Sequence, residues 1–312
     1  MAGARWCVRS GKCLGRPGNQ TQSEQLNGRQ KSAVLPGRRP ENGSFLTAGT
    51  PDLLCRRLKP DRVNVLGVGI SVINLATARQ AIAGALAARA KGYICVTDAH
   101  SVTEAQNDPS FRRILNRAFL CTPDGMPMVW MGRLAGYREI DRVYGPDLML
   151  AVCEWTRTSG HTHFLFGGAD GVAQQLKGNL EKKFPGIRIV GACSPPFRPL
   201  TAGEEAALTR LVSGLKPDIF WVGLGAPKQE KFMAQYLDKF ETTLMVGVGA
   251  AFDFHTGRVR QAPRWMQRSG LEWFFRLGVE PRRLWKRYLR SNPLFIARVL
   301  LQKTGLRNYP LE

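Results

Sequence analysis

Between residues 62 and 250 the sequence alternates short apolar segments with longer amphipathic or alanine-rich segments. The short segments have the composition of buried strands, and the longer ones are typical of helices. This alternation predicts an α/β fold, a mostly parallel sheet flanked by helices. We expect strands at 62–69, 92–97, 119–122, 163–168, 187–193, 217–225 and 242–250, and helices at 75–90, 102–117, 146–156, 171–184, 202–215 and 228–239.

The positive charge of the chain is concentrated at its two ends. The 312 residues include 45 Lys and Arg against 24 Asp and Glu, a net charge of +21. Residues 1–60 hold 11 basic and 3 acidic residues, and residues 258–312 hold 13 and 3, so the middle is nearly neutral. Basic ends favour a polyanionic partner, which would be nucleic acid, an anionic membrane or a phosphorylated substrate. Charge alone does not choose among these.

Composition divides the chain into three parts. Residues 1–58 are rich in Gly, Arg, Pro, Ser, Gln and Asn and have no apolar periodicity, which predicts a disordered basic tail. The alternatives for this part are an RNA-binding arm and a translation start site that has been assigned too far upstream. Residues 59–258 are expected to form the α/β core, and residues 259–312 a basic, aromatic appendage.

The appendage interleaves aromatic residues with Arg and Lys between residues 262 and 301. We expect helices there, broken at 278–281 and at 292–293. A cationic amphipathic segment of this kind fits a membrane interface, where apolar groups enter the headgroup boundary and Arg and Lys meet lipid phosphates. A helical pair packed on the sheet and a nucleic-acid contact are the alternatives. The oligomeric state stays open, because this segment would also fit against a second copy in a homo-oligomer.

No segment predicts a membrane-spanning helix, a disulfide framework or a metal site. The longest uncharged run, 63–78, contains four polar residues, and a spanning helix needs about 20 mostly apolar ones. The first 25 residues lack a signal-peptide core. Seven cysteines form no CxxC pair, which favours buried thiols in a reducing compartment, and four His residues show no zinc spacing. We therefore expect a protein of the cytosol or of the cytosolic face of a membrane.

Two loops that follow predicted strands carry the candidate chemistry, because ligands of parallel sheets bind beyond the carboxyl ends of the strands. Asp124 lies between Pro123 and Pro127 in the first of these loops, where its carboxylate could take a proton as a general base. The structural alternative is an Asx turn, since Pro-Asp-Gly is a strong turn signal.

The second loop is the glycine-rich segment 223–230, with Gly223, Gly225, Lys228 and Gln229 before a predicted helix. Small residues let a ligand approach the backbone, and helix N-terminal amides can hold a phosphate. Gly167 and Gly168 precede the helix at 171–184 in the same manner, and the Arg142 guanidinium could contact a phosphate. Tight turns without a ligand are the alternative for each glycine cluster. A complete GxGxxG motif and a P-loop are both missing, so a dinucleotide is not expected.

Five motifs occur in one order along residues 62–290. They are Asp124-Gly125-Met126, Arg142 with 145–147, 166–168, the GLGAPKQE segment 223–230, and 247–253 followed by Gly257 and 262–264. Together they resemble the WecG/TagA/CpsF family of bacterial glycosyltransferases. The resemblance implies a Rossmann-like core with a C-terminal membrane-associating appendage. It also implies inverting, metal-independent transfer, without a cofactor, of a sugar from a UDP-sugar to a saccharide on undecaprenyl diphosphate. This chemistry takes place at the cytoplasmic face of the bacterial inner membrane, in cell-surface polysaccharide or exopolysaccharide synthesis.

The resemblance also assigns residues. It implies Asp124 as the base, Arg142 as a phosphate ligand and Gln229 as a site residue. The appendage arginines of the family correspond to the region of Arg276, Arg282, Arg283 and Arg287, which would meet lipid or acceptor phosphates. Many relatives have an Asn where we align Asp98. This departure puts N-acetylmannosamine as the donor in doubt, and the segment 96–104 is closer to exopolysaccharide members that resemble glucosyltransferases.

The main hypothesis is therefore a peripheral glycosyltransferase that moves a hexose or N-acetylhexosamine. Two other functional classes are weighed against it. A nucleic-acid-binding protein would use the basic ends and show steep salt dependence, but no nucleic-acid motif is found. A non-catalytic assembly factor would keep the tail without needing Asp124, Arg142 and Gln229, all of which are present.

Overall fold

The computed structural model describes residues 59–311, and the predicted basic tail, 1–58, lies outside the described residues. The described chain is an α/β fold with C-terminal helices, as predicted. Its centre is a six-stranded sheet of order β4-β3-β8-β7-β5-β6, in which every pairing is parallel. The strands are β3 (Gly92–Thr97), β4 (Leu120–Pro123), β5 (Thr162–Gly167), β6 (Arg188–Cys193), β7 (Ile219–Gly223) and β8 (Leu244–Gly247).

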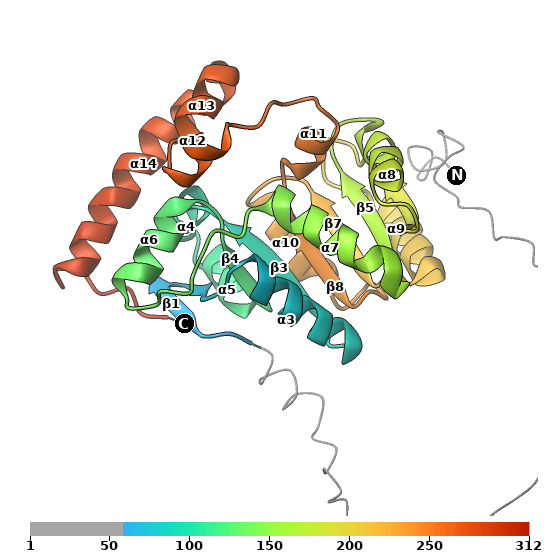
Figure 1. Cartoon of the computed structure of the whole chain (residues 1–312), viewed down its shortest axis with the longest axis horizontal. Coiled ribbons are helices and arrows are strands. Elements are labelled where there is room, and N and C mark those ends of the chain that lie inside the picture. Colours follow the sequence, from blue (N-terminus) through green and yellow to red (C-terminus); the bar gives the residue numbers. More distant parts are fainter. Residues whose placement is uncertain (1–58, 312) are drawn as a thin grey trace, which may run out of the picture.

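Helices cover both faces of this sheet (Figure 1). On the near face lie α3 (Leu75–Ala87), α7 (Gly145–Ser159) and α8 (Val172–Lys183), with the short α11 (Ala251–His255) above them. The other face packs against α5 (Pro109–Arg117), α9 (Ala202–Leu215) and α10 (Lys228–Tyr236). Each layer buries its own apolar cluster, so the two cores are separated by the sheet.

Strand β7 shows how the sequence forms both cores at once. Successive side chains of a strand point to opposite faces. Phe220 and Val222 accordingly belong to the cluster under α9 and α10, whereas Ile219 and Trp221 belong to the cluster under α7 and α8. This strand is buried on both faces, which explains its continuous apolar sequence.

The strand expected at 62–69 forms a hairpin outside the parallel sheet. Strand β1 (Arg62–Val65) pairs only with β2 (Val68–Ser71), and the pairing is antiparallel. Leu66 and Gly67, at the turn, both have positive φ, of 52° and 77°. Two successive residues with positive φ characterise the tight turns that match the twist of a two-residue hairpin.

Three helical predictions need correction. The helix expected at 102–117 is two helices, α4 (Ala99–Ala105) and α5, because Asp108 caps α5 and Pro109 occupies its first turn. The loop expected after Asp124 is largely helix α6 (Met126–Leu134), with Pro127 in its first turn. The break expected at 292–293 is absent, because α14 (Pro281–Lys303) continues through Pro293.

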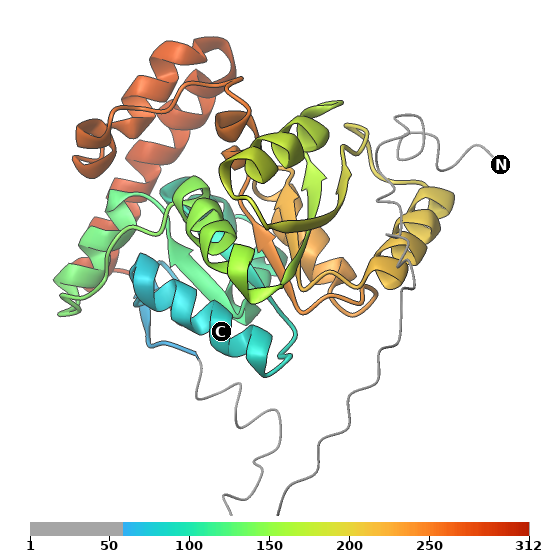
Figure 2. The same cartoon turned by 45° about the vertical axis from the view of Figure 1, so that its right-hand side comes forward.

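The C-terminal helices form a layer beside the α/β core. Helices α12 (Arg264–Arg268) and α13 (Glu272–Val279) precede α14, and a break at Glu280 separates α13 from α14 as predicted. Figures 1 and 2 show this red layer on one side of the molecule, joined to α11 by an extended segment. Helix α14 lies along α4 and buries Leu284, Tyr288 and Phe295. The chain then returns to the hairpin, where the Asn64 side-chain amide donates to the Tyr309 carbonyl at 2.7 Å.

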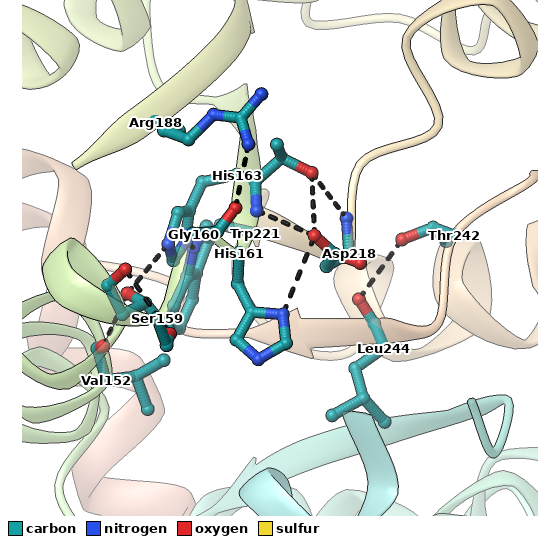
Figure 3. Close-up of polar contacts among 12 residues, drawn as sticks. Val152, Ser159, Gly160, His161, His163, Arg188, Asp218, Trp221, Thr242 and Leu244 are labelled. Atoms are coloured by element: carbon teal, nitrogen blue, oxygen red, sulfur yellow. Dashed lines mark hydrogen bonds and ion pairs between the residues drawn. The ribbon is translucent and has the colours of Figure 1, made fainter. Parts of the chain in front are cut away.

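A buried polar cluster lies at the amino edge of the sheet, where the parallel strands begin (Figure 3). The Trp221 indole N–H donates to Nδ1 of His163 at 3.0 Å, and Nε2 of His163 lies 2.9 Å from the Thr156 hydroxyl. This hydroxyl donates in turn to the Val152 carbonyl at 2.7 Å. Burial lowers the pKa of His163 to about 4. The neutral imidazole is therefore fully hydrogen-bonded within the fold.

Across residues 59–311, no helix has the length and apolar character needed to cross a bilayer.

Candidate active site

A cleft of about 870 Å³ lies over the carboxyl edge of the parallel sheet. Its floor comes from the segments that follow the strands, and α13 and α14 close one side of it through Arg276, Leu284 and Arg287. The segment 195–200, after β6, forms the opposite wall. Of the candidates from the sequence, the cleft is lined by Asp98, Asp124, Gly168, Gly223, Gly225, Lys228, Gln229, Arg276 and Arg287.

Asp124 and Asp98 are neighbours because their strands are neighbours. Thr97 pairs with Pro123 in the parallel register of β3 and β4, so the next residue of each strand enters the cleft. The Asp124 backbone N–H donates to the Thr97 carbonyl at 3.0 Å, which fixes the end of β4. Burial raises the pKa of Asp124 to about 7, against the lowering effect of Arg142. The Asp124 carboxyl is thus suited to exchange a proton near neutral pH.

Arg142 lies beside Asp124, and the appendage holds it there. One terminal nitrogen of Arg142, Nη2, is 3.6 Å from Oδ1 of Asp124 and donates to the Glu272 carboxylate. The other, Nη1, donates to Oε1 of Gln267 at 2.9 Å. The guanidinium also lies 4.0 Å from the centre of the Tyr144 ring. Both terminal nitrogens therefore already have acceptors from α12 and α13.

Asp98 is tied to the long C-terminal helix. It is the N-cap of α4, where Oδ1 accepts from the N–H and the hydroxyl of Ser101, each at 2.8 Å. Its other oxygen, Oδ2, accepts from Nη2 of Arg287 at 2.8 Å. Burial raises the pKa of Asp98, but the charge of Arg287 and the Ser101 bonds outweigh it and hold the pKa below its usual range. Asp98 is therefore an anion in a polar part of the cleft.

Gln229 has its amide fixed from both ends. Its Oε1 accepts from the Gly249 N–H at 3.0 Å, and its Nε2 donates to Oε1 of Glu230 at 2.9 Å. Glu230 is buried, and burial raises its pKa to about 7. One N–H of the Gln229 amide remains for the cleft that this residue lines.

The glycines at this edge have packing reasons of their own. Gly167 and Gly223 are direct partners of β5 and β7, and a Cβ on Gly167 would lie 2.5 Å from the Gly223 carbonyl oxygen. A Cβ on Gly223 would lie 2.6 Å from the Phe252 ring. The pairing of the two strands therefore accounts for Gly167, and the packing of α11 on β7 accounts for Gly223. Contact of either glycine with a donor stays a prediction.

Only some of the basic residues predicted to meet phosphates line the cleft. Arg276 and Arg287 line the cleft, Lys228 lines it with an exposed side chain, and Arg282 is exposed on α14 outside the lining. The side chain of Arg283 lies outside the described part of the structure. Arg142 and Gly167 do not line the cleft. Gly167 precedes Gly168, which does, and Arg142 lies 3.6 Å from the lining residue Asp124. Within residues 59–311, no three or more His, Cys, Asp or Glu side chains gather as a metal site.

Gln267 and Glu272 were missed by sequence reasoning. They reach Arg142 across 125 and 130 residues, and nothing local in α12 or α13 predicts that contact. Ser101 was missed as well, and the available signal lay in Asp98, because Asp is a preferred N-cap residue whose side chain accepts from a backbone N–H of the first turn.

Comparison with known proteins identifies the class. Residues 63–309 match the family model described as "Glycosyl transferase WecG/TagA/CpsF family". The chain is 30% identical over 205 residues to the N-acetylglucosaminyldiphosphoundecaprenol N-acetyl-beta-D-mannosaminyltransferase of Bacillus subtilis (strain 168), covering 66% of this chain and 77% of the relative. It is also 30% identical over 197 residues to the protein with the same description from Bacillus spizizenii (strain ATCC 23059 / NRRL B-14472 / W23), covering 63% and 74%.

The family match spans almost all of the described residues, including the cleft and the helices that close it. The chain therefore belongs to the WecG/TagA/CpsF family and is a glycosyltransferase.

Proposed function

We propose that the protein transfers a hexose or N-acetylhexosamine from a UDP-sugar to a saccharide on undecaprenyl diphosphate, with inversion at the anomeric carbon. The Bacillus relatives support the acceptor, because their description names N-acetylglucosaminyldiphosphoundecaprenol. The observation that carries the proposal is the meeting of Asp124, with its pKa of about 7, and two appendage guanidiniums in one cleft.

Asp124 is the proposed base. Its carboxylate takes the proton from an acceptor hydroxyl, the hydroxyl oxygen bonds to the anomeric carbon from the face opposite UDP, and the bond from that carbon to the UDP oxygen breaks. UDP leaves with the electron pair of the broken bond. The mechanism needs one base and a stabilised leaving group, and this cleft supplies a carboxyl with a pKa near the working pH.

The negative charge on departing UDP requires cations. Arg276, Arg287 and Lys228 all line the cleft and are the proposed partners of the donor and acceptor phosphates. Arg142 remains a predicted phosphate ligand, although both of its terminal nitrogens already have acceptors. We propose metal-independent transfer, so EDTA is expected to leave the rate unchanged. Loss of activity with EDTA and recovery with a divalent cation would contradict this part.

Asp98 is the proposed donor-sugar contact. An anionic carboxylate accepts hydrogen bonds from sugar hydroxyls, and Arg287 and Ser101 fix its orientation. The Bacillus relatives are described as transferring N-acetylmannosamine, but a charged Asp98 favours a hydroxyl over an acetamido carbonyl at this position. A hexose such as glucose is therefore the first donor to try.

We propose that the protein works at the cytoplasmic face of the inner membrane as a peripheral protein. Helix α14 has one apolar face on α4 and a second, exposed one, made of Trp285, Leu289, Ile296 and Leu300. The exposed bases Lys286 and Arg290 flank this second stripe. Aromatic and aliphatic groups beside cations suit an anionic lipid surface.

Vesicle sedimentation tests the membrane contact with the full chain. Replacement of Trp285 and Ile296 by Ser should weaken binding to vesicles containing anionic lipid. Replacement of Phe197, an exposed aromatic on the far wall of the cleft, should not. Equal binding of both variants would remove the stripe as the contact surface.

UDP release tests the reaction itself. The purified protein is mixed with UDP-glucose, UDP-N-acetylmannosamine, UDP-N-acetylglucosamine or UDP-glucuronic acid, each with and without a soluble prenyl-diphosphate saccharide. Acceptor-dependent release from one donor is expected, and it would name the sugar. If no donor supports release but the protein binds RNA with steep salt dependence, the proposal is overturned in favour of nucleic-acid binding.

A further inference from the structure

Two carboxylates compete for one nitrogen of Arg142. Nη2 donates to Glu272 of α13, and the same nitrogen stands 3.6 Å from Oδ1 of Asp124. A distance of 3.6 Å is too long for a hydrogen bond. The guanidinium is thus turned towards the appendage, and Asp124 keeps its lone pairs for another partner.

The position of Arg142 is fixed on the appendage side by more than Glu272. Nη1 donates to Gln267, whose own amide donates to the Ala262 carbonyl at 2.8 Å. The Tyr144 ring packs against the guanidinium, 4.0 Å from its central carbon. Among these contacts, only Glu272 acts on the nitrogen that faces Asp124.

We propose that Glu272 is a positioning residue for the transfer reaction, which holds the Arg142 guanidinium off Asp124 and keeps that carboxylate available as the base. This inference rests on the proposed role of Asp124 and adds a residue from the appendage to it. Glu272 acts through Arg142 and needs no contact with either substrate.

The charges around Asp124 give the direction of the effect. Burial raises the pKa of Asp124 most, Arg142 lowers it, Glu272 and Asp98 raise it, and Arg276 lowers it. Tyr144, beside Arg142, is uncharged, because burial raises its pKa. Removing the charge of Glu272 takes away a like charge and weakens the bond that holds Arg142 on the appendage side, so that the guanidinium can move closer to Asp124. Both changes lower the pKa of Asp124, and an arginine partner typically lowers an aspartate by about 1–3 units.

The pH dependence of the transfer rate tests this. The base must be unprotonated, so the rate rises with pH through the pKa of Asp124, which is about 7. In Glu272→Gln the rising limb should move to lower pH by about one unit, and the plateau rate should fall because the base is weaker. KM for the donor should change little. Glu181→Gln, which removes an equal charge from α8 outside the cleft lining, is the matched control and should keep the wild-type profile.

A second readout does not depend on activity. The infrared absorption of the protonated carboxyl, taken as the difference between the protein and its Asp124→Asn variant, follows the titration of Asp124 directly. The midpoint should be lower in the Glu272→Gln background than in the wild-type background. Glu272→Ala is the second variant, and the same direction is expected. Thermal unfolding of each variant checks that it is folded.

The two readouts separate failure of this inference from failure of the proposed function. If the protein transfers sugar and neither Glu272 variant lowers the midpoint or the rising limb, Glu272 does not position Arg142 and the inference is wrong. If no sugar is transferred but the Asp124 midpoint still falls in Glu272→Gln, the electrostatic inference holds and the proposed function fails.

Discussion

The two edges of the parallel sheet treat polar side chains in opposite ways. At the amino edge, both ring nitrogens of buried His163 have partners within the fold, and its pKa is held at about 4 (Figure 3). At the carboxyl edge, Asp124 lies in an open cleft with its pKa raised to about 7, and Arg142 is beside it but not hydrogen-bonded to it. Burial drives both shifts. The difference is that the first group is satisfied by the protein and the second is left for a ligand.

Replacing the proposed base at the carboxyl edge should have the largest effect, and the quantity affected is the transfer rate. Asp124→Asn is expected to lower the transfer rate by about 10²–10⁴-fold, because the amide cannot accept the acceptor proton. Binding of UDP should persist, because the cationic groups remain. The rate is measured by UDP release, the binding by calorimetry. Turnover close to wild type would remove Asp124 as the base.

The second largest effect is expected for Arg287, the cation through which the appendage contacts Asp98 in the cleft. Arg287→Met should lower kcat/KM by about 10- to 100-fold. It removes a guanidinium that would donate hydrogen bonds to a phosphate, and it leaves Asp98 without its charged partner. Arg290→Met, with an exposed side chain on the same helix, is the control for loss of one positive charge. Equal effects of the two variants in a soluble assay would show that only the general charge of α14 matters.

At the amino edge the expected effect is on stability alone. Trp221→Phe removes the donor to Nδ1 of buried His163 and should lower the free energy of unfolding by about 1–3 kcal/mol. For a chain of this size that lowers Tm by about 2–4 °C per kcal/mol. The transfer rate below Tm should stay unchanged. A large loss of rate without a loss of Tm would mean that the two edges are coupled.

The parallel sheet and the N-terminal hairpin differ in how far the sequence predicts them. All six parallel strands were expected, because buried strands have continuous apolar sequences and helical segments separate them. Asp98 and Asp124 were expected at strand ends, and parallel register then makes them neighbours. The hairpin at 62–71 was only half predicted, since the turn at Leu66 and Gly67 carries no Asn-Gly or Asp-Gly signal.

Contacts between distant segments were not predictable from local patterns. Arg142 meets Glu272 and Gln267 only because α12 and α13 pack beside the loop before α7. The hydrogen bond from Arg287, a predicted ligand of a lipid or acceptor phosphate, to Asp98 in the cleft was not predictable from local patterns either. Helix α14 also continues through Pro293, because its packing against α4 buries residues on both sides of the proline, including Tyr288 and Phe295.

The smallest net effect is expected in the pH dependence of the wild-type stability, because two groups with shifted pKa values act in opposite directions. Asp124 has its pKa raised in the fold, so it favours folding at low pH, and this contribution is lost as pH rises from about 4 to 7. His163 has its pKa lowered, so its contribution is present above about pH 6.5 and is lost as pH falls towards 4. The two slopes oppose each other, each by up to about 1.4 kcal/mol per pH unit.

Urea unfolding between pH 4.5 and 6.5 separates the two contributions. Asp124→Asn should make stability rise more steeply with pH, and His163→Gln should make it fall with pH relative to wild type. Parallel profiles for all three proteins would show that neither group is shifted as described.

The stereochemistry of transfer tests the central claim most directly. A single displacement with Asp124 as base requires that the new glycosidic bond have the anomeric configuration opposite to that of the sugar in the UDP donor. The product is made with the donor identified by UDP release, and its anomeric proton coupling is read by NMR before any rearrangement. We predict inversion. Retention of the donor configuration would contradict the account, because it requires a covalent or front-face route in which Asp124 is not the base described here.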